Sequence, residues 1–69
     1  MLDPGEVDRE AYELFLRGLE IFNHRELARF DEAIDLLQRS IEAEPSFALA
    51  HAVLGRVYST QAGYFRVPS

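Results

Sequence analysis

The chain contains no cysteine and no tryptophan, and its only two imidazoles are those of His24 and His51. Without cysteine there is no disulfide and no thiolate metal site, and these two histidines do not make a ligand cluster. No apolar run approaches the roughly 18 residues that a membrane-spanning helix needs. The acidic, polar opening from Met1 to Glu10 lacks the pattern of a signal peptide. These absences predict a cytoplasmic protein without a metal or cofactor.

Positive charge is also scarce, because 7 basic residues face 12 acidic ones and the net charge is −5. Nucleic acids and anionic membranes need a basic surface, so neither is expected as a partner. The composition, 48% hydrophobic and 28% charged over 69 residues, is that of one folded domain. So short a chain usually needs a disulfide, a metal or a partner to be stable. Association is the one of these that the sequence leaves open.

Three segments show the apolar spacing of helices, at about residues 7–23, 27–43 and 47–62. Residues 1–6 are expected to form a disordered tail, and residues 63–69 a C-terminal tail. Asp8 and Ser46 are the predicted N-caps of the first and third helices. Pro45 ends the second helix, and Gly63 is predicted at the left-handed position after the third. The fold is predicted to be all-α, with three antiparallel helices that pack in sequence order.

Part of the sequence repeats at one constant offset. At that offset, the positions of Leu14, Gly18 and Ile21 correspond to those of His51, Gly55 and Tyr58. With Leu54, the later set has the spacing of the first helix of a tetratricopeptide repeat. Ala33, Leu37 and Pro45 match the second half of that pattern. The chain thus resembles the tetratricopeptide-repeat family over nearly its whole length.

The resemblance implies a fragment of a right-handed helical superhelix about one and a half repeats long. Six positions are then expected to serve helix packing: Gly18, Ala33, Leu37, Pro45, Leu54 and Gly55. The repeat offset is somewhat longer than the family's period of about 34 residues, and the surplus falls around residues 23–29. Arg17 and His51 also depart from the family pattern. The second repeat lacks its second helix.

Members of this family bind peptides in a concave groove lined by the first helices of the repeats. The resemblance places these residues in that groove: Tyr12, Phe15, Leu19, Phe22, Leu49, Ala52, Arg56 and Ser59. Because most of them are apolar, the expected ligand is an apolar peptide or helix. Arg56 is the only cation among them, so the carboxylate clamp of one family subgroup is not expected. The sequence equally allows Tyr12, Phe15 and Phe22 to be ordinary core residues.

A second apolar surface is expected on the third helix, where the absent helix would have packed. The residues predicted there are Val53, Val57 and Tyr58, with Leu54 partly shared. A large exposed apolar patch usually marks an interface, and stacked repeats need about three units for stability. The chain is therefore predicted to self-associate, most simply as a two-fold homodimer.

The sequence leaves a structural alternative open, in which the chain has no separate ligand. It would then be an oligomerisation unit, or a fragment of a larger repeat protein. The segment from Ala11 to Gly18 resembles repeat segments of larger bacterial regulators, which favours this alternative. An enzyme is not expected, because Ser40, Ser46 and Ser59 lack the histidine and carboxylate partners of a nucleophilic triad.

Overall fold

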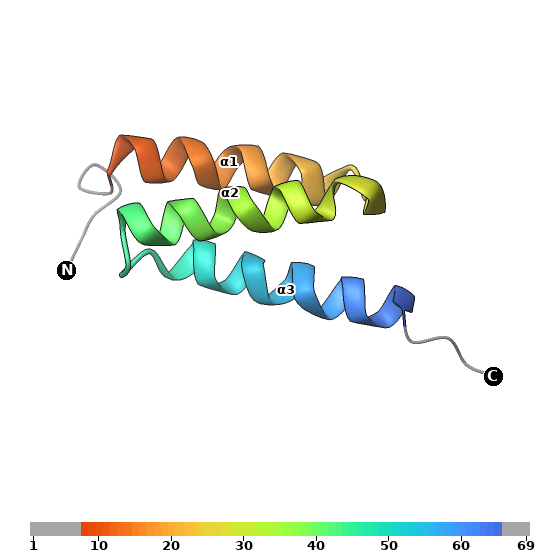
Figure 1. Ribbon diagram of the computed structural model, residues 1–69. Helices are drawn as coiled ribbons and strands as arrows, with labels where there is room; N and C mark the ends of the chain where they lie inside the picture. The colour runs from red at the N-terminus through yellow and green to blue at the C-terminus, as the bar shows by residue number, and fades with distance from the viewer. Residues whose placement is uncertain (1–7, 66–69) are drawn as a thin grey trace.

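The computed structural model describes residues 8–65, and within them the chain is helical, without strands. The elements are α1 (Arg9–Asn23), a short 3-10 helix η2 (Leu27–Arg29), α2 (Phe30–Ala43) and α3 (Ala48–Phe65). Figure 1 shows α2 returning beside α1 and α3 returning beside α2. The all-α prediction is therefore confirmed. Residues 1–6 and 66–69 of the two predicted tails lie outside the described residues.

Local hydrogen bonds cap both ends of helix α1. The side chain of Asp8 accepts hydrogen bonds from the backbone N–H groups of Glu10 (2.8 Å) and Ala11 (3.3 Å). This confirms the predicted N-cap, although the helix begins at Arg9 rather than near residue 7. At the other end Arg25 adopts a left-handed conformation with φ 57°. Its N–H donates to the carbonyl oxygen of Phe22 at 3.0 Å.

The second predicted helix is divided into two elements. Residues 27–29 form η2, and the α-helix begins only at Phe30. The turn after α1 and the 3-10 helix together occupy the stretch where the surplus residues of the repeat were expected. Helix α2 ends at Ala43, where the N–H of Glu44 still donates to Ser40 and Pro45 follows. A proline cannot continue the helical hydrogen-bond pattern, as the sequence predicted.

Helix α3 differs from its prediction at both ends. It begins at Ala48, and the hydroxyl of Ser46 donates to Glu44 Oε2 at 2.8 Å rather than capping the helix. It continues to Phe65, so Gly63 lies inside the helix and not in the left-handed position after it. A glycine inside a helix costs only about 1 kcal/mol relative to alanine, and it does not by itself end the helix.

The main hydrophobic core joins all three helices. Its buried members are Ala11, Phe15, Phe22, Phe30, Leu37, Phe47, Ala50, Val53 and Val57. A smaller cluster of Ile21, Ala33 and Leu36 lies between α1 and α2. Leu54 packs against the edge of the main core, as the repeat pattern predicted, whereas Pro45 lies in the exposed turn before α3.

The two helical glycines of the repeat pattern have different surroundings. A Cβ atom placed on Gly18 would lie 2.9 Å from Leu37 Cγ and 3.2 Å from the carbonyl oxygen of Ala33. Gly18 therefore allows α2 to approach α1 closely, which confirms its predicted role. Gly55 has no neighbouring atom within 4 Å of such a Cβ. Its predicted packing role is wrong within residues 8–65, because no described element covers that side of α3.

Ser40 supplies the one buried polar side chain of the described core, at 0% exposure. Its hydroxyl donates to the carbonyl oxygen of Ala11 at 2.6 Å and so links α2 to the start of α1. We expect Ser40→Ala to lower the free energy of unfolding by about 1 kcal/mol, the usual contribution of such a hydrogen bond. Urea unfolding followed by circular dichroism measures this change. A variant as stable as the parent would show that the bond contributes nothing.

Candidate protein-binding surfaces

The first candidate surface, here called the α1–α3 face, consists of side chains that point outward where α1 and α3 adjoin. Its members are Tyr12, Leu16 and Leu19 from α1 with Leu49, Ala52 and Arg56 from α3. Tyr12, Leu16 and Leu49 are 47%, 43% and 58% exposed, although they are large and apolar. In each helix the three residues are three or four apart, so they share one side.

Two aromatic contacts hold the helices together beneath this face. The ring of Phe47, just before α3, lies 5.0 Å from that of Phe15 and 6.3 Å from that of Tyr12, measured between centroids. Phe15 and Phe22 are 5% and 3% exposed, and both belong to the main core. Their predicted place in the groove is therefore wrong. Both rings turn toward the other helices rather than toward solvent.

The remaining predicted groove residues reach the surface. Tyr12, Leu49, Ala52, Arg56 and Ser59 are exposed, and Leu19 is half-buried at the core edge. Leu16 belongs to the same face, but the repeat pattern did not single it out. Its spacing of four from Tyr12 and three from Leu19 is the signal that would have found it.

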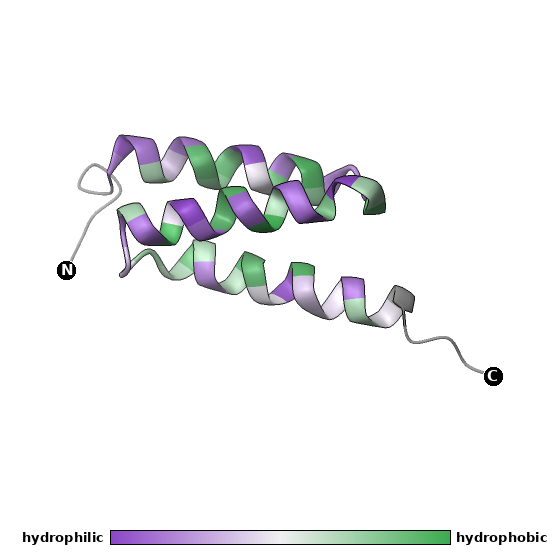
Figure 2. Cartoon of the chain, viewed as in Figure 1, coloured by the Kyte–Doolittle hydropathy of each residue, from purple (hydrophilic) through white to green (hydrophobic). Residues whose placement is uncertain are grey.

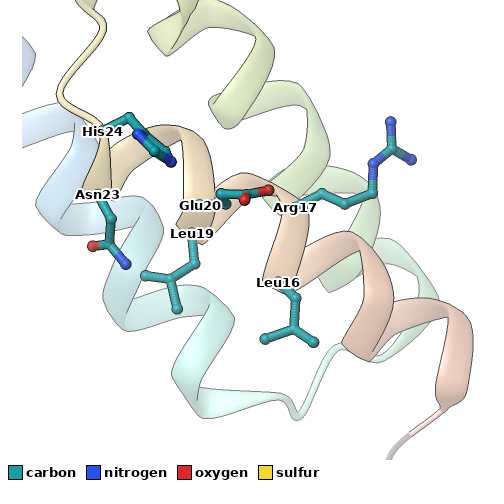
Figure 3. Close-up of a pocket in the computed structure, with 6 residues that line it drawn as sticks. All are labelled: Leu16, Arg17, Leu19, Glu20, Asn23 and His24. Carbon is teal, nitrogen blue, oxygen red and sulfur yellow. The ribbon is translucent and has the colours of Figure 1, made fainter.

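A shallow hollow of about 450 Å³ lies over the outer side of α1. Figure 3 shows Leu16, Leu19 and Asn23 projecting from one side of the helix and Arg17 from the other. The residues that line the hollow come from α1, apart from His24, which directly follows it. It is therefore an open surface of one helix and not a closed binding cavity, which suits a peptide side chain better than a small molecule.

Two arginines lie over the ring of Phe22: Arg56, which belongs to the α1–α3 face, and Arg25, which follows α1. The guanidinium carbon of Arg25 lies 4.7 Å from the ring centroid, and that of Arg56 lies 5.9 Å from it. Cations over an aromatic ring are attracted by its quadrupole. Arg56 was expected in the groove as its only cation. Arg25 was missed because it lies in a turn, beyond the repeated helical pattern.

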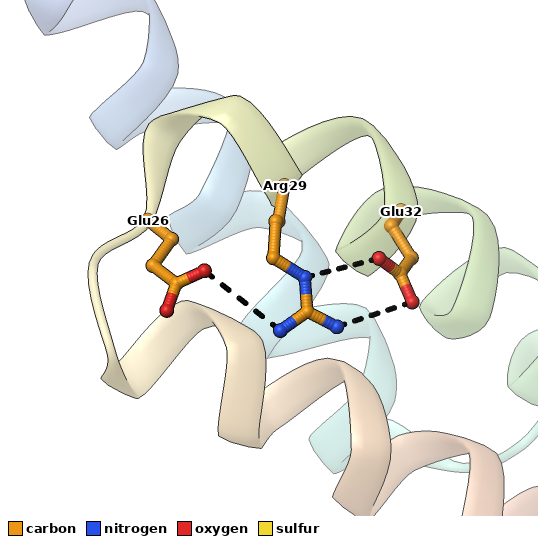
Figure 4. Close-up of polar contacts among 3 residues, drawn as sticks. All are labelled: Glu26, Arg29 and Glu32. Carbon is orange, nitrogen blue, oxygen red and sulfur yellow. Dashed lines mark hydrogen bonds and ion pairs between the residues drawn. The ribbon is translucent and has the colours of Figure 1, made fainter.

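A different arginine, Arg29, has carboxylate partners. Its Nε and Nη2 donate to the two oxygens of Glu32 at 3.1 and 3.3 Å, and Nη1 lies 3.8 Å from Glu26 (Figure 4). The hydrogen bond with Glu32, and then the charges of Glu32, Glu26 and Glu20, raise the pKa of Arg29. Arg39 likewise pairs with Asp35 at 3.0 Å. These two arginines are therefore less available to a ligand than Arg25 and Arg56.

The second candidate surface is the exposed side of α3 around Gly55, here called the uncovered face. It consists of Ala48, His51, Gly55, Tyr58 and Ala62, all exposed. Val53 and Val57, predicted on this surface, are 8% and 0% exposed. That prediction is wrong, because both valines point into the core. Tyr58, at 45% exposed, does lie on the uncovered face.

Helix α3 is unusually free of charge on all sides. Every acidic residue of the chain precedes Pro45, and Arg56 is the one charged residue between Ala48 and Phe65. Figure 2 accordingly shows α3 as mostly green to white, whereas purple positions are frequent on α1 and α2. Two hydrogen bonds join the edge of α3 to α2, and the α3 side chain is uncharged in both. Gln38 donates to Tyr58 Oη at 3.1 Å, and Gln61 donates to Asp31 at 3.4 Å.

Within residues 8–65, no three histidine, aspartate or glutamate side chains gather as they would to hold a metal ion. None of the helices described here has the length and apolar character to cross a membrane. No protein-family model matches the chain, and no characterised protein or solved structure is significantly similar to it. The case for a function therefore rests on the surfaces of the molecule itself.

Proposed function

We propose that the chain is a protein-interaction module of the tetratricopeptide-repeat kind, which binds an apolar helix or extended segment and has no catalytic activity. The proposal includes the superhelical arrangement of one and a half repeats that the sequence resembles. It also keeps the cytoplasmic location predicted from the composition. The close contact of Gly18 with Leu37 supports the repeat packing, because it occurs where the repeat pattern has its glycine.

The exposed apolar side chains of the α1–α3 face carry this proposal. Tyr12, Leu16 and Leu49 expose about half of their surface although a chain of 69 residues has little apolar surface to spare. The contacts of Tyr12 with Phe47 and of Arg56 with Phe22 bring α1 and α3 together along this face. An apolar segment that covers them removes them from water, which stabilises the complex by roughly 25 cal/mol for each Å² buried.

Selection from a displayed library of random short peptides tests the proposal directly. We expect the chain to enrich peptides rich in leucine, isoleucine, valine and phenylalanine. Leu49→Asp places a charge on the α1–α3 face and should abolish this enrichment, since an unpaired charge in an apolar interface is costly. Circular dichroism should show unchanged helicity, because Leu49 is 58% exposed. If Leu49→Asp enriches the same peptides, the ligand does not bind at this face.

Self-association is a second candidate function, and the open space at Gly55 supports it. The uncovered face is built of small or apolar side chains apart from His51, so a second copy of α3 can approach it closely. We expect light scattering after size exclusion to give twice the chain mass of 7.9 kDa at micromolar concentration. Tyr58→Asp should return the mass to that of one chain. A parent protein that is already monomeric would refute self-association.

These two variants are reciprocal controls. Leu49→Asp should leave the dimer intact, and Tyr58→Asp should leave peptide enrichment intact, because the two residues lie on different sides of α3. A dimer without any peptide enrichment would support the structural alternative, in which the chain is an oligomerisation unit or part of a larger repeat protein or bacterial regulator. Loss of both properties in both variants would point to unfolding, which the helicity measurement detects.

A further inference from the structure

We propose that the segment bound at the α1–α3 face carries an acidic side chain among its apolar ones, and that its carboxylate binds Arg25 and Arg56 beside Phe22. This inference rests on the proposed function and specifies the chemistry of the partner. It predicts that acidic character, and not apolar character alone, distinguishes a good ligand from a poor one.

The first support is the convergence of the two guanidinium groups. Arg25 follows α1 and Arg56 lies in α3, yet both side chains lie over the one ring of Phe22, 4.7 and 5.9 Å from its centroid. Both guanidinium carbons therefore lie within 5.9 Å of one ring centroid. Phe22 is itself 3% exposed and fixed in the core, so it holds both cations at the end of α1. A carboxylate can accept hydrogen bonds from two guanidinium groups at once.

The second support is electrostatic. Among residues 8–65, Arg29 and Arg39 lie within ion-pair distance of carboxylates, whereas Arg25 and Arg56 do not. Arg9 and Arg17 have no such partner in this range either, but only Arg25 and Arg56 lie over one aromatic ring. Helix α3 contains no acidic residue, so it offers Arg56 no partner within its own helix. The positive charge at this end of an otherwise apolar face is thus complementary to a negative charge on the partner.

The backbone of Arg25 supports the same interpretation. Its φ of 57° is a left-handed conformation that glycine or asparagine adopts more readily than arginine does. The hydrogen bond from its N–H to Phe22 holds this turn, and the turn places the side chain over the Phe22 ring. Arginine at this position therefore contributes its side chain rather than a favourable backbone conformation.

The course of α3 identifies the carboxylate as that of an internal side chain. The helix itself continues beyond Arg56 as far as Phe65, so α3 extends past the two arginines. A bound segment can pass them and continue along α3. An aspartate or glutamate within the segment therefore fits this arrangement better than a chain terminus does.

The test uses the same peptide library, displayed so that the random segment has no free carboxyl terminus. We expect the parent chain to enrich peptides with an aspartate or glutamate between apolar residues. The variant Arg25→Asn with Arg56→Gln should still enrich apolar peptides but lose the preference for acidic ones. Asparagine suits the left-handed turn, so this variant should fold. Arg39→Gln is the matched control, because Arg39 lies in α2, pairs with Asp35 and belongs to a helix that contributes no residue to the α1–α3 face.

Fluorescence anisotropy on one enriched peptide then measures the interaction. Replacing its acidic residue by the corresponding amide should weaken binding to the parent chain about fivefold, as for a partly exposed ion pair. It should leave binding to the double-arginine variant unchanged. The difference should also shrink between about 0.05 and about 0.5 M salt, because ions screen exposed charges.

The outcomes separate this inference from the proposed function. Enrichment of apolar peptides without an acidic preference would overturn the inference and leave the proposed function standing. No enrichment of any kind would overturn both. An acidic preference that survives in the double-arginine variant would place the carboxylate elsewhere and refute the role of Arg25 and Arg56. A preference that appears only when the library has free carboxyl termini would show that the ligand group is a chain terminus.

Discussion

Replacing Phe15 with alanine is expected to lower the free energy of unfolding by about 3–5 kcal/mol, the range found for large aromatic side chains removed from cores. Phe15 is 5% exposed, and its ring lies 5.0 Å from that of Phe47, so it joins α1 to the start of α3. A domain of 69 residues has a total stability of roughly 3–10 kcal/mol. A substantial fraction of the variant should therefore be unfolded at 25 °C, as urea titration would show.

The neighbouring Tyr12→Ala variant is the matched control. Tyr12 belongs to the same aromatic group but is 47% exposed, so it should lose about 1 kcal/mol or less. Tyr12→Ala should instead weaken peptide binding, because the side chain lies on the α1–α3 face. If Phe15→Ala were nearly as stable as the parent and bound peptide poorly, Phe15 would be a groove residue after all.

The second large effect is that replacing two glycines with alanine should change the stability of the protein in opposite directions. Gly18→Ala should destabilise the protein by about 1–3 kcal/mol, because the new Cβ would overlap Leu37 Cγ at 2.9 Å. The overlap involves a branch carbon of a fully buried leucine, and the Ala33 carbonyl lies close by, so neither neighbour moves freely. Gly55→Ala should stabilise the protein by about 1 kcal/mol, because alanine favours the helix and its Cβ has no neighbour within 4 Å.

Thermal and urea unfolding of the two variants, measured side by side, tests this prediction. Both substitutions add the same methyl group to the middle of a helix, so their helix propensities cancel in the comparison. The remaining difference in stability arises because α2 covers Gly18, whereas Gly55 faces open space. Measurements belong at a concentration where the parent is monomeric, since a dimer that covered Gly55 would make its substitution unfavourable as well. Equal effects of the two variants would contradict the described packing of α1 against α2.

The helices were predictable because their signals are local. Asp8 at the start of α1 and Pro45 after α2 act on the backbone groups next to them, and the structure places both helix ends there. Gly63 was misleading because glycine permits a helix end without requiring one. Ser46 was misleading for a similar reason, since its hydroxyl found a nearer partner in Glu44.

The surfaces were harder to predict than the helices. A helix that is apolar over most of its circumference does not indicate which side will be covered, and Val53 and Val57 were assigned to the wrong one. The repeat pattern did place Leu49 and Arg56 at the surface. It had no means of finding Arg25, whose position beside Phe22 depends on a left-handed turn between elements.

Within the residues of α3 whose side chains the structure describes, the core reaches Val57. Beyond it, from Tyr58 to Gly63, every residue is exposed or half-buried. Beyond Val57, the side-chain contacts with α2 include the hydrogen bonds of Tyr58 and Gln61. Local opening should therefore be easier at this end of α3 than in α1 or α2, because the free energy of opening follows the buried apolar contacts that must be broken. A partner that covers this end would couple its own binding to the ordering of the helix, so that part of its binding energy is used to complete the fold.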